Sequence, residues 1–291
     1  MMKRVIYSLY VDVPAIEHYG LSKHMGDTIE RASITVNAFK DNYKRLVDCK
    51  RKYADSIGAT FLMYENDNQY KTFSQNFIKN FPQLTGYEII NFYKIHLLNE
   101  LAKEYDEILY LDFDAVPVTK DSFFDVWDLS KGICVYNNNA MINKKNKPID
   151  KISSGIRSPT AKYYNCQAML IENGFDPNND VINTGIIGAR KEDIIKLNYF
   201  DKFKDIIDLM TKLRNYDTSF YPQNIINMFR YDNETIFSYK RKVNNVNIQW
   251  LDNQWHYFFD KQYYIPKETK IVHAVCKQFD TIWRFCEKHN I

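Results

Sequence analysis

The chain carries two aspartates one residue apart, Asp112 and Asp114, within the segment YLDFDAVPV at 110–118. An apolar run from Ile108 to Leu111 leads into them, and residues i and i+2 of a strand share one face. Two neighbouring carboxylates repel each other unless a cation lies between them, and such hard oxygen ligands suit Mg²⁺ or Mn²⁺. The pattern therefore predicts a metal site that binds a pyrophosphate. This site would belong to an enzyme that acts on a nucleotide diphosphate. The alternative is a strand end with two solvated aspartates.

The elements around this pair indicate an α/β fold. Apolar runs at 3–11 and 59–64 predict buried strands, and a third strand at 107–112 ends at the aspartates. Apolar residues at helical spacing predict a helix at about 88–104 before that third strand. Alternating strands and helices favour a largely parallel sheet. Ligands of such sheets bind beyond the carboxyl ends of the strands, which is where the aspartate pair falls.

The rest of the chain shows neither an internal repeat nor a clear linker. Residues 65–86 are polar and turn-rich. The Asn-, Lys- and Ser-rich segment 137–165 is either an excursion over the active site or a surface loop. The further predicted elements are a loop at 13–30, a helix at 31–57, a short helix capped by Asp121 that contains Phe124 and Trp127, strands at 132–136 and 181–189, a long helix at about 200–213, and a strand within KIVHAV at 270–275.

Composition narrows the class of protein. The 291 residues are 45% hydrophobic, enough for a substantial core. With 9 glycines and neither GxGxxG nor GxxxxGK[ST], a glycine-rich phosphate loop is not expected. The net charge of +3 does not point to nucleic acid. Five scattered cysteines without a CxxC motif suggest reduced thiols. Because no stretch approaches the roughly 18 apolar residues of a membrane helix and no signal peptide is recognisable, we expect a cytoplasmic protein.

Several short motifs occur in a characteristic order. IINFYKIHLLNEL precedes YLDFDAVPV, FFDVW follows, and NTGIIGARKEDI, PQNIIN and KIVHAV come later. This order, over roughly residues 3–285, resembles that of nucleotide-sugar glycosyltransferases of the GT-A fold, particularly the retaining family 8 of glycogenin and galactosyltransferase type. The resemblance implies a Rossmann-like, mostly parallel central sheet flanked by helices, with a smaller C-terminal acceptor-side region. It also implies one domain over 1–291, with a nucleotide-binding half at 1–136 and an acceptor-side half at 137–291.

The resemblance implies a metal site and a sugar site. Asp112 and Asp114 are similar to the family's metal-binding pair and His273 to its third ligand, with Mn²⁺ or Mg²⁺ as cofactor. A neutral imidazole is a good ligand for Mn²⁺ beside carboxylates; without the resemblance, His273 is more simply a hydrogen-bonded histidine at a strand end. Asn183 and Gly185 match the Asn-x-Gly turn that lines the sugar or acceptor site, or form a plain tight turn.

Other roles follow from the same resemblance. Lys94 stands where the family has a basic residue near phosphate or sugar, and Gln223 matches its glutamine near the reacting sugar carbon, so Gln223, Asn183 and Lys94 are the implied catalytic residues. Tyr10 and Asp12 fall where the family recognises the nucleobase by stacking and hydrogen bonding. The residues implied in donor binding are Tyr10, Asp12, Lys94, Asp112, Asp114, Gly185 and Lys277.

The sequence departs from the family pattern at four places. Pro222 stands before Gln223 where the family usually has aspartate, Cys276 occupies a usual glycine position, and Ile282 precedes Trp283 where proline is usual. Lys277 comes earlier than the family's lysine. The pyrophosphate-binding lysine is therefore the least secure of the implied residues.

The implied activity is metal-dependent transfer of a sugar from a nucleotide-sugar donor, with UDP as the expected nucleotide, to a hydroxyl acceptor with retention of configuration. The acceptor could be a glycan, a lipid, a protein or modified DNA. Inversion would need a general base, for which the candidates are Asp217, Asp252 and Glu172.

Two other functions remain open. Asp112, Asp114 and Val116 also match the first motif of haloacid-dehalogenase-like phosphatases, in which Asp112 would be the nucleophile and Asp114 the general acid. That motif normally opens its domain, and no late acidic pair completes the site. A non-catalytic protein that binds nucleotide sugars is the second alternative, against which the intact Asp-x-Asp argues.

Overall fold

The computed structural model describes residues 2–12, 14, 29–142, 148–215, 220–260 and 263–291. The predicted loop at 13–30 lies largely outside these residues, as does part of the segment 137–165. The strands are β1 (Arg4–Leu9), β2 (Thr60–Tyr64), β3 (Glu107–Leu111), β4 (Ala115–Pro117), β5 (Ile133–Asn137), β6 (Ile182–Arg190), β7 (Ile248–Trp250), β8 (Tyr257–Phe258) and β9 (Ile271–His273).

The helices surround these strands on both sides. They are α2 (Ile29–Ser56), α3 (Asn68–Asn80), α4 (Gly86–Leu101), α5 (Phe123–Val126), α6 (Pro159–Glu172), α7 (Lys191–Leu197), α8 (Phe203–Arg214), α9 (Gln223–Ile226), α10 (Asn233–Val243) and α11 (Phe279–His289). No described helix combines the length and the hydropathy that a bilayer-spanning segment needs.

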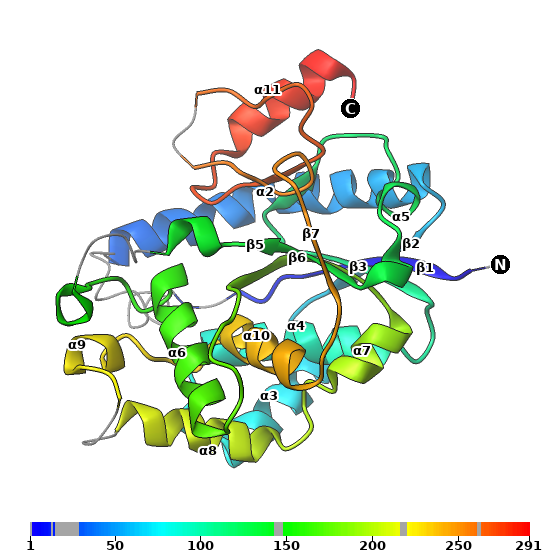
Figure 1. Ribbon diagram of the computed structural model, residues 1–291. Helices are drawn as coiled ribbons and strands as arrows, with labels where there is room; N and C mark the ends of the chain where they lie inside the picture. The colour runs from blue at the N-terminus through cyan, green and yellow to red at the C-terminus, as the bar shows by residue number, and fades with distance from the viewer. Residues whose placement is uncertain (1, 13, 15–28, 143–147, 216–219, 261–262) are drawn as a thin grey trace.

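A six-stranded sheet in the order β2-β1-β3-β6-β5-β7 forms the centre of the described part. Three of its five pairings are parallel, β1 with β2, β1 with β3 and β5 with β7, whereas β6 runs antiparallel to both of its neighbours. The expected α/β class with a mostly parallel sheet is therefore confirmed. The sheet lies between two layers of helices, with α2 on one side and α4, α7 and α10 on the other (Figure 1).

Strand β1 shows why two layers form. Side chains of a strand alternate between its faces, and Val5 and Tyr7 pack in the cluster of α4, α6 and α10, while Ile6 packs with Tyr53 and Ala54 of α2. All three β1 side chains are fully buried. Burial on both faces explains the nearly continuous apolar run at the start of the sequence.

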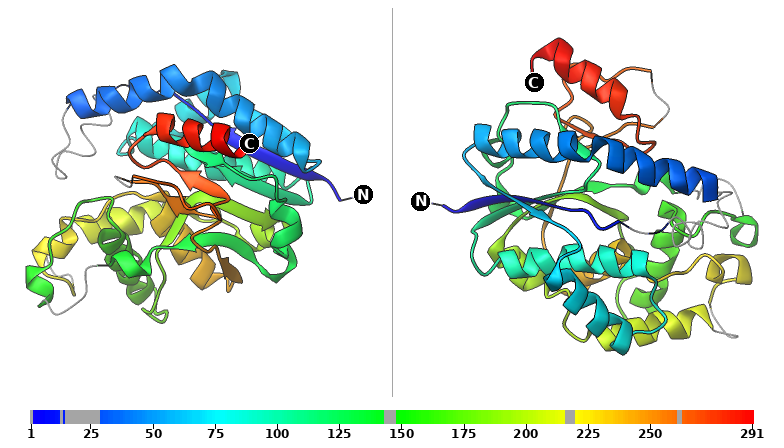
Figure 2. Two further views of the ribbon diagram at one scale, coloured as in Figure 1. Left: turned by 90° about the horizontal axis from the view of Figure 1, so that it is seen from above. Right: turned by 180° about the vertical axis from the view of Figure 1, so that it is seen from behind.

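A three-stranded sheet, β4-β9-β8, forms the smaller unit. Its apolar side chains pack against α2 and α11, where Val116 and Val272 contact the cluster that contains Phe279 and Trp283. The Trp283 indole donates a hydrogen bond of 2.7 Å to Asn42 on α2. Figure 2 shows α11 lying beside α2 in both views. The small sheet is thus fixed to a helix of the nucleotide-side half, and residues of both predicted halves share the central sheet.

The structure corrects several local predictions. The polar stretch 65–86 contains helix α3, capped by Asp67, and α6 begins inside the segment 137–165 at Pro159. The short helix α5 starts after Ser122, so Asp121 is not its N-cap. Strand β3 ends at Leu111, one residue before the aspartate pair.

Candidate metal centre and cavity

The two aspartates lie on the turn that connects the two sheets. Asp112 follows β3 of the central sheet, Asp114 precedes β4 of the small sheet, and the Ala115 amide donates a hydrogen bond of 2.8 Å to the Asp112 carbonyl across the turn. The Asp112 amide donates to the Gly185 carbonyl at 2.7 Å. The expectation that strand pleating places both carboxylates on one face is therefore wrong. A turn, held to β6, brings them together.

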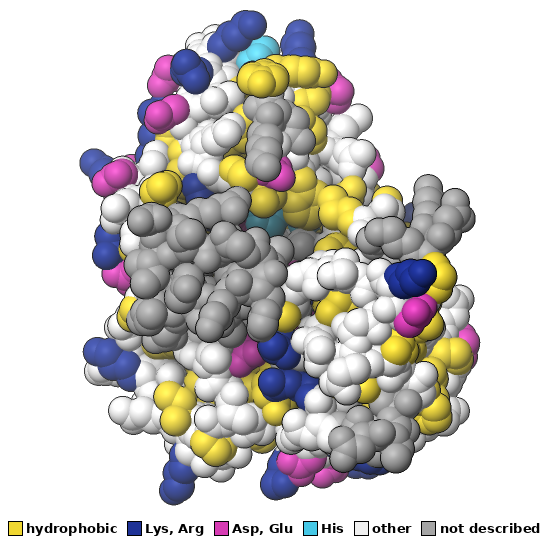
Figure 3. Space-filling view, turned by 90° about the vertical axis from the view of Figure 1, so that its left-hand side faces the viewer, with side chains coloured by type: hydrophobic (Ala, Val, Ile, Leu, Met, Phe, Trp, Pro, Cys, Tyr) yellow, Lys and Arg dark blue, Asp and Glu magenta, His cyan; other side chains and the backbone are white. Residues whose placement is uncertain are grey.

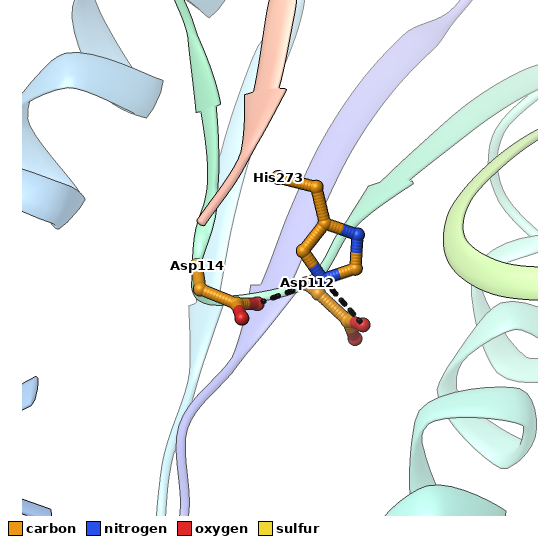
Figure 4. Close-up of side chains that lie close together, drawn as sticks. All are labelled: Asp112, Asp114 and His273. Carbon is orange, nitrogen blue, oxygen red and sulfur yellow. Dashed lines mark ion pairs between the residues drawn. The ribbon is translucent and has the colours of Figure 1, made fainter. Parts of the chain in front are cut away.

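His273 completes a group of three possible metal ligands. It ends β9, whose antiparallel register sets His273 opposite Ala115, directly after Asp114. Its Nε2 lies 3.4 Å from Asp114 Oδ1 and 4.0 Å from Asp112 Oδ2, and the imidazole projects between the carboxylates (Figure 4). One ligand atom from each residue falls within 4.8 Å of the others. The structure thus brings the three predicted metal-binding residues together, and two carboxylates with one imidazole suit a divalent ion such as Mn²⁺.

The charges at this centre are mutually stabilised. Burial raises the pKa of the Asp114 carboxyl, but Lys277 and then His273 outweigh burial and hold that pKa well below its ordinary value. Burial alone would lower the pKa of His273; Asp114 and Asp112 raise it above the ordinary value. The Lys277 ammonium donates a short hydrogen bond to Asp114. Asp114 is therefore an anion, and a bound divalent ion would share it with Lys277 or replace that partner.

Two neighbours fix the His273 ring. His256 is fully buried, and its Nε2 lies 2.8 Å from His273 Nδ1, which leaves His273 Nε2 directed at the carboxylates. Burial and then His273 hold the pKa of His256 well below its ordinary value, so His256 is neutral and can accept the Nδ1 proton. On the other side, a Cβ at Gly185 would meet His273 Cε1 at 2.5 Å. The close approach of the ring to β6 therefore requires a glycine.

Asp112 has a second set of partners on the opposite side. The Tyr110 hydroxyl donates to its Oδ1 at 2.5 Å, and Lys94 Nζ lies 3.4 Å from the same oxygen. Lys94 is 4% exposed and also donates to the Thr184 carbonyl at 3.2 Å. The lysine predicted on the helix before β3 is thus a buried neighbour of the metal centre rather than a solvated helix residue.

These residues line one wall of a cavity of about 570 Å³, a size typical of small-molecule sites. Figure 3 shows the corresponding hollow, with a histidine in its depth, hydrophobic side chains above it, and basic and acidic side chains grouped below. Tyr10, Asp12, Lys94, Asn183 and Lys277 line it together with the three candidate ligands. Nearly all the predicted site residues therefore converge on one cavity.

Tyr10 forms the aromatic end of the cavity. Its ring stacks on Phe113 with centroids 4.6 Å apart, and Phe39 lies at 5.8 Å. Burial, followed by the charge of Asp12, raises the pKa of Tyr10 to about 12. Asp12 itself is exposed and forms an ion pair of 2.9 Å with Lys40. A planar ring beside an acceptor carboxylate is an arrangement that could hold a nucleobase.

Asn183 and Gly185 lie within strand β6, so both the Asn-x-Gly turn implied by the resemblance and the plain tight turn offered as its alternative are wrong. Asn183 Oδ1 accepts a hydrogen bond of 2.9 Å from the Gly185 amide. Gln223 is not among the described residues that line the cavity; it is exposed at the start of α9 and donates to Asn227 at 2.9 Å. The catalytic role given to Gln223 stays a prediction without a supporting contact.

The three candidate bases for inversion lie away from the cavity or outside the described residues. Asp252 accepts hydrogen bonds from the amides of Gln254 and Trp255, and Glu172 pairs with Lys212. Neither is among the described residues of the cavity lining, and Asp217 lies outside the described part of the chain.

No protein-family profile matches the chain, and no curated protein matches it in sequence. Several solved structures match the chain in fold. The match to an active-site mutant of LgtC, 12% identical, covers 98% of this chain and 95% of the LgtC chain, with a TM-score of 0.43. A glycosyltransferase involved in glycosylation of the major capsid of PBCV-1, 14% identical, covers 99% and 100% with a TM-score of 0.43. Mouse xyloside xylosyltransferase 1, 10% identical, covers 96% and 99% with a TM-score of 0.42.

The chain is structurally similar to glycosyltransferases along nearly its whole length. This is the class of enzyme that the sequence motifs resemble. All three identities lie below 25% and all three TM-scores below 0.5, so these likenesses carry no argument about activity. A function has to be argued from the geometry of the metal centre and of the cavity.

Sequence reasoning missed a second group of charged residues in the cavity. Glu234 accepts hydrogen bonds from the Thr184 amide and hydroxyl at 2.8 and 3.2 Å and forms a close ion pair with Lys162. Asp232 caps α10, and the Asn233 side-chain amide donates to the Thr184 hydroxyl at 2.8 Å. The sequence signal was the cap, an aspartate two residues before a glutamate at a helix start. That this helix start faces the cavity depends on its packing against β6.

Proposed function

We propose that the protein is a metal-dependent glycosyltransferase that moves a sugar from a nucleotide-sugar donor to a hydroxyl acceptor. The observation that carries this proposal is the convergence of Asp112, Asp114 and His273 at the wall of a cavity with an aromatic end and four basic side chains. This arrangement provides for a divalent ion, a diphosphate and a planar base in one place.

Asp112, Asp114 and His273 would hold the ion. When bound, a divalent ion neutralises the charge that develops on a departing nucleoside diphosphate. Mn²⁺ is favoured over Mg²⁺ because an imidazole is among the ligands. His256 and Gly185 keep the ring in place, so the donor set is largely prearranged.

Lys277 and Lys94 would bind the anionic part of the donor. Each lies beside one carboxylate of the metal centre, Lys277 at Asp114 and Lys94 at Asp112. Cations placed where charge grows in the transition state favour that state over the bound substrate. Tyr10 would stack on the nucleobase, which makes a UDP-sugar the first donor to test.

The transferred sugar would lie between the metal centre and the charged group at the start of α10. Asn183, Asp232 and Asn233 line this part of the cavity and offer amide and carboxylate groups to sugar hydroxyls. We further propose retention of configuration, as the family resemblance implies, which the anomeric signals of the product in NMR would reveal.

Hydrolysis of a donor without acceptor is the direct test. Purified protein with Mn²⁺ should slowly release the nucleoside diphosphate from one member of a nucleotide-sugar panel. Asp112→Asn and Asp114→Asn should each lower the rate by about 10²-fold, which corresponds to about 3 kcal/mol of transition-state stabilisation. Asp208→Asn, at an exposed residue of α8, is the matched control and should keep full activity.

The outcomes separate the three functions. Release of phosphate from a generic phosphoester with a trapped aspartyl species would support the phosphatase, and binding without turnover would support the non-catalytic protein. The phosphatase lacks structural support, because the third group at the centre is His273 and no additional acidic pair joins it among the described residues. Donor hydrolysis that survives both substitutions would contradict the proposal.

A further inference from the structure

Four basic side chains line the cavity, and three of them have a carboxylate partner. The fourth, Arg157, differs: among the residues that the structure describes, no carboxylate lies within ion-pair distance of its guanidinium group. An arginine offers five N–H donors and is always charged, so this cation is available to a ligand. The three established pairs are Lys94 with Asp112, Lys277 with Asp114, and Lys162 with Glu234.

The Arg157 side chain is held in place by a ring, but one of its N–H groups has no hydrogen-bond acceptor. Its guanidinium carbon lies 4.1 Å from the centroid of the Tyr87 ring, a cation–π contact that fixes the plane of the group. Its Nη2 is shielded from solvent and has no hydrogen-bond partner in the described structure. A shielded, charged N–H without an acceptor is costly. Because Nη2 is closed to solvent, an oxyanion from the cavity would meet the accessible part of this half-buried side chain, whose plane the Tyr87 contact holds.

Arg157 contacts α4 about two helical turns from the lysine that contacts the metal centre. Tyr87, Asn91 and Lys94 line the cavity from one face of α4, at positions i, i+4 and i+7. Seven residues of α-helix span about 10 Å. Lys94 contacts Asp112 at one end of this row, and Tyr87 contacts Arg157 at the other. A diphosphate at the metal centre would therefore lie about 10 Å along α4 from Arg157, whereas a substrate next to the transferred sugar would lie beside it, because Asp232 and Asn233 adjoin Arg157.

No described carboxylate in the surroundings of Arg157 pairs with it directly. A recess of about 20 Å³ adjoins it and also contains the guanidinium of Arg230. Two carboxylates line this recess as well, but both are engaged: Glu88 accepts from the Thr85 amide at 2.8 Å, and Asp232 accepts from two amides of α10 at 3.0 Å. The recess is too small for a sugar, so a ligand group would meet Arg157 from the main cavity.

We propose that Arg157, oriented by Tyr87, binds a carboxylate or phosphate group of the acceptor, so that the enzyme prefers acidic or phosphorylated acceptors over neutral ones. This inference rests on the proposed glycosyltransferase function, because that function places the donor at the metal end and leaves the Arg157 end to the acceptor. Guanidinium groups bind both oxyanions in bidentate fashion, so the chemistry covers both sources.

The test uses simple probes in place of the unidentified acceptor. The full-length protein, with Mn²⁺ and UDP added to occupy the donor end, is titrated with methyl glucuronide, methyl glucoside and glucose 6-phosphate, and dissociation constants are measured by NMR. We expect the wild type to bind one of the charged probes about tenfold or more tightly than the glucoside. Arg157→Gln should abolish that preference and Arg157→Lys should restore part of it. Arg51→Gln, at an exposed arginine of α2, should change nothing.

Every other result contradicts either the role of Arg157, its assignment to the acceptor, or the proposed function. Equal binding of charged and neutral probes by the wild type, or a preference that survives in Arg157→Gln, would overturn the inference. Discrimination that appears only between uronic-acid and neutral donors would assign the anion to the donor and overturn the acceptor assignment. Absence of donor hydrolysis in the wild type would contradict the proposed function instead, whatever the probes do. Thermal unfolding of each variant confirms that it is folded.

Discussion

Among single residues, Gly185 shows how closely the metal centre is packed. A Cβ there would lie 2.5 Å from His273 Cε1 and 2.9 Å from Nδ1, which is hydrogen-bonded to His256. The ring could move aside only by giving up that hydrogen bond. We therefore expect Gly185→Ala to weaken Mn²⁺ binding by about tenfold or more, the scale of losses when metal ligands are disturbed through their neighbours. Isothermal titration with Mn²⁺ in the presence of UDP measures this.

Gly188 provides a matched control on the same strand. A Cβ there would lie 2.4 Å from a Phe123 ring carbon, in the apolar cluster rather than at the metal centre. Gly188→Ala should lower the melting temperature and leave the Mn²⁺ affinity of the folded protein unchanged. Equal loss of affinity in both variants would show that general loosening of β6, not displacement of His273, is the cause.

Among helices and strands, the buried pair of Lys162 and Glu234 joins α6, α10 and β6. Lys162 lies on α6, and Glu234 on α10 accepts from Thr184 of β6 at 2.8 and 3.2 Å. Glu234→Gln keeps an acceptor for Thr184 but leaves the lysine without its close partner. Because Lys162 would keep only the more distant Asp232, at 3.8 Å, we expect a loss of up to about 3 kcal/mol of folding stability at pH 7, measured by denaturant unfolding.

The pH dependence of that loss follows from the pKa of Glu234. Burial raises this pKa, but Lys162 and Lys94 lower it below the ordinary 4.5. A depressed carboxyl pKa stabilises the fold above the unfolded-state value, and this contribution disappears as the pH falls through the folded-state value. The gap between wild type and Glu234→Gln should therefore be largest near neutrality and narrow below about pH 4.5. Glu287→Gln, in an exposed pair with Arg45, should cost under about 1 kcal/mol; a gap for Glu234→Gln independent of pH would contradict the charged state of Glu234.

For the molecule as a whole, the metal centre lies where two sheets meet. Asp112 belongs to the end of the central sheet and His273 to the small sheet, which α2 and α11 hold in place. A ligand that engages both sheets should stabilise the complete fold by mass action, by about 2.7 kcal/mol at a hundred times its dissociation constant. We expect Mn²⁺ and UDP together to raise the melting temperature, and either one alone to raise it less.

The same measurement on Asp114→Asn identifies the site responsible. In this variant the combined effect of Mn²⁺ and UDP should vanish, and in wild type EDTA should reverse it. A thermal shift that persists in Asp114→Asn would place the metal-dependent binding elsewhere.

Features that depend on neighbouring residues were predictable. Uninterrupted apolar runs identified β1, β2 and β3, and helical spacing identified α4, because burial of both sheet faces imposes these patterns locally. Motif order supplied Asp112, Asp114 and His273. Helix α3 was missed because its apolar face is narrow, with Tyr70, Phe73 and Phe77 among mostly polar residues.

Features that depend on packing were not predictable. The aspartates meet on a turn rather than on a strand face, because β4 leaves the central sheet to pair with β9. Arg157 and Lys162 lie five residues apart at the start of α6, but Glu234 comes from α10, and which of the two cations it pairs with depends on how α10 packs against α6 and β6. The sequence pattern of a helix or strand predicts which of its side chains are buried. The distance between charges far apart in the chain is set by the contacts between elements, and it is this distance that leaves Arg157 without a described partner while neutralising its neighbours.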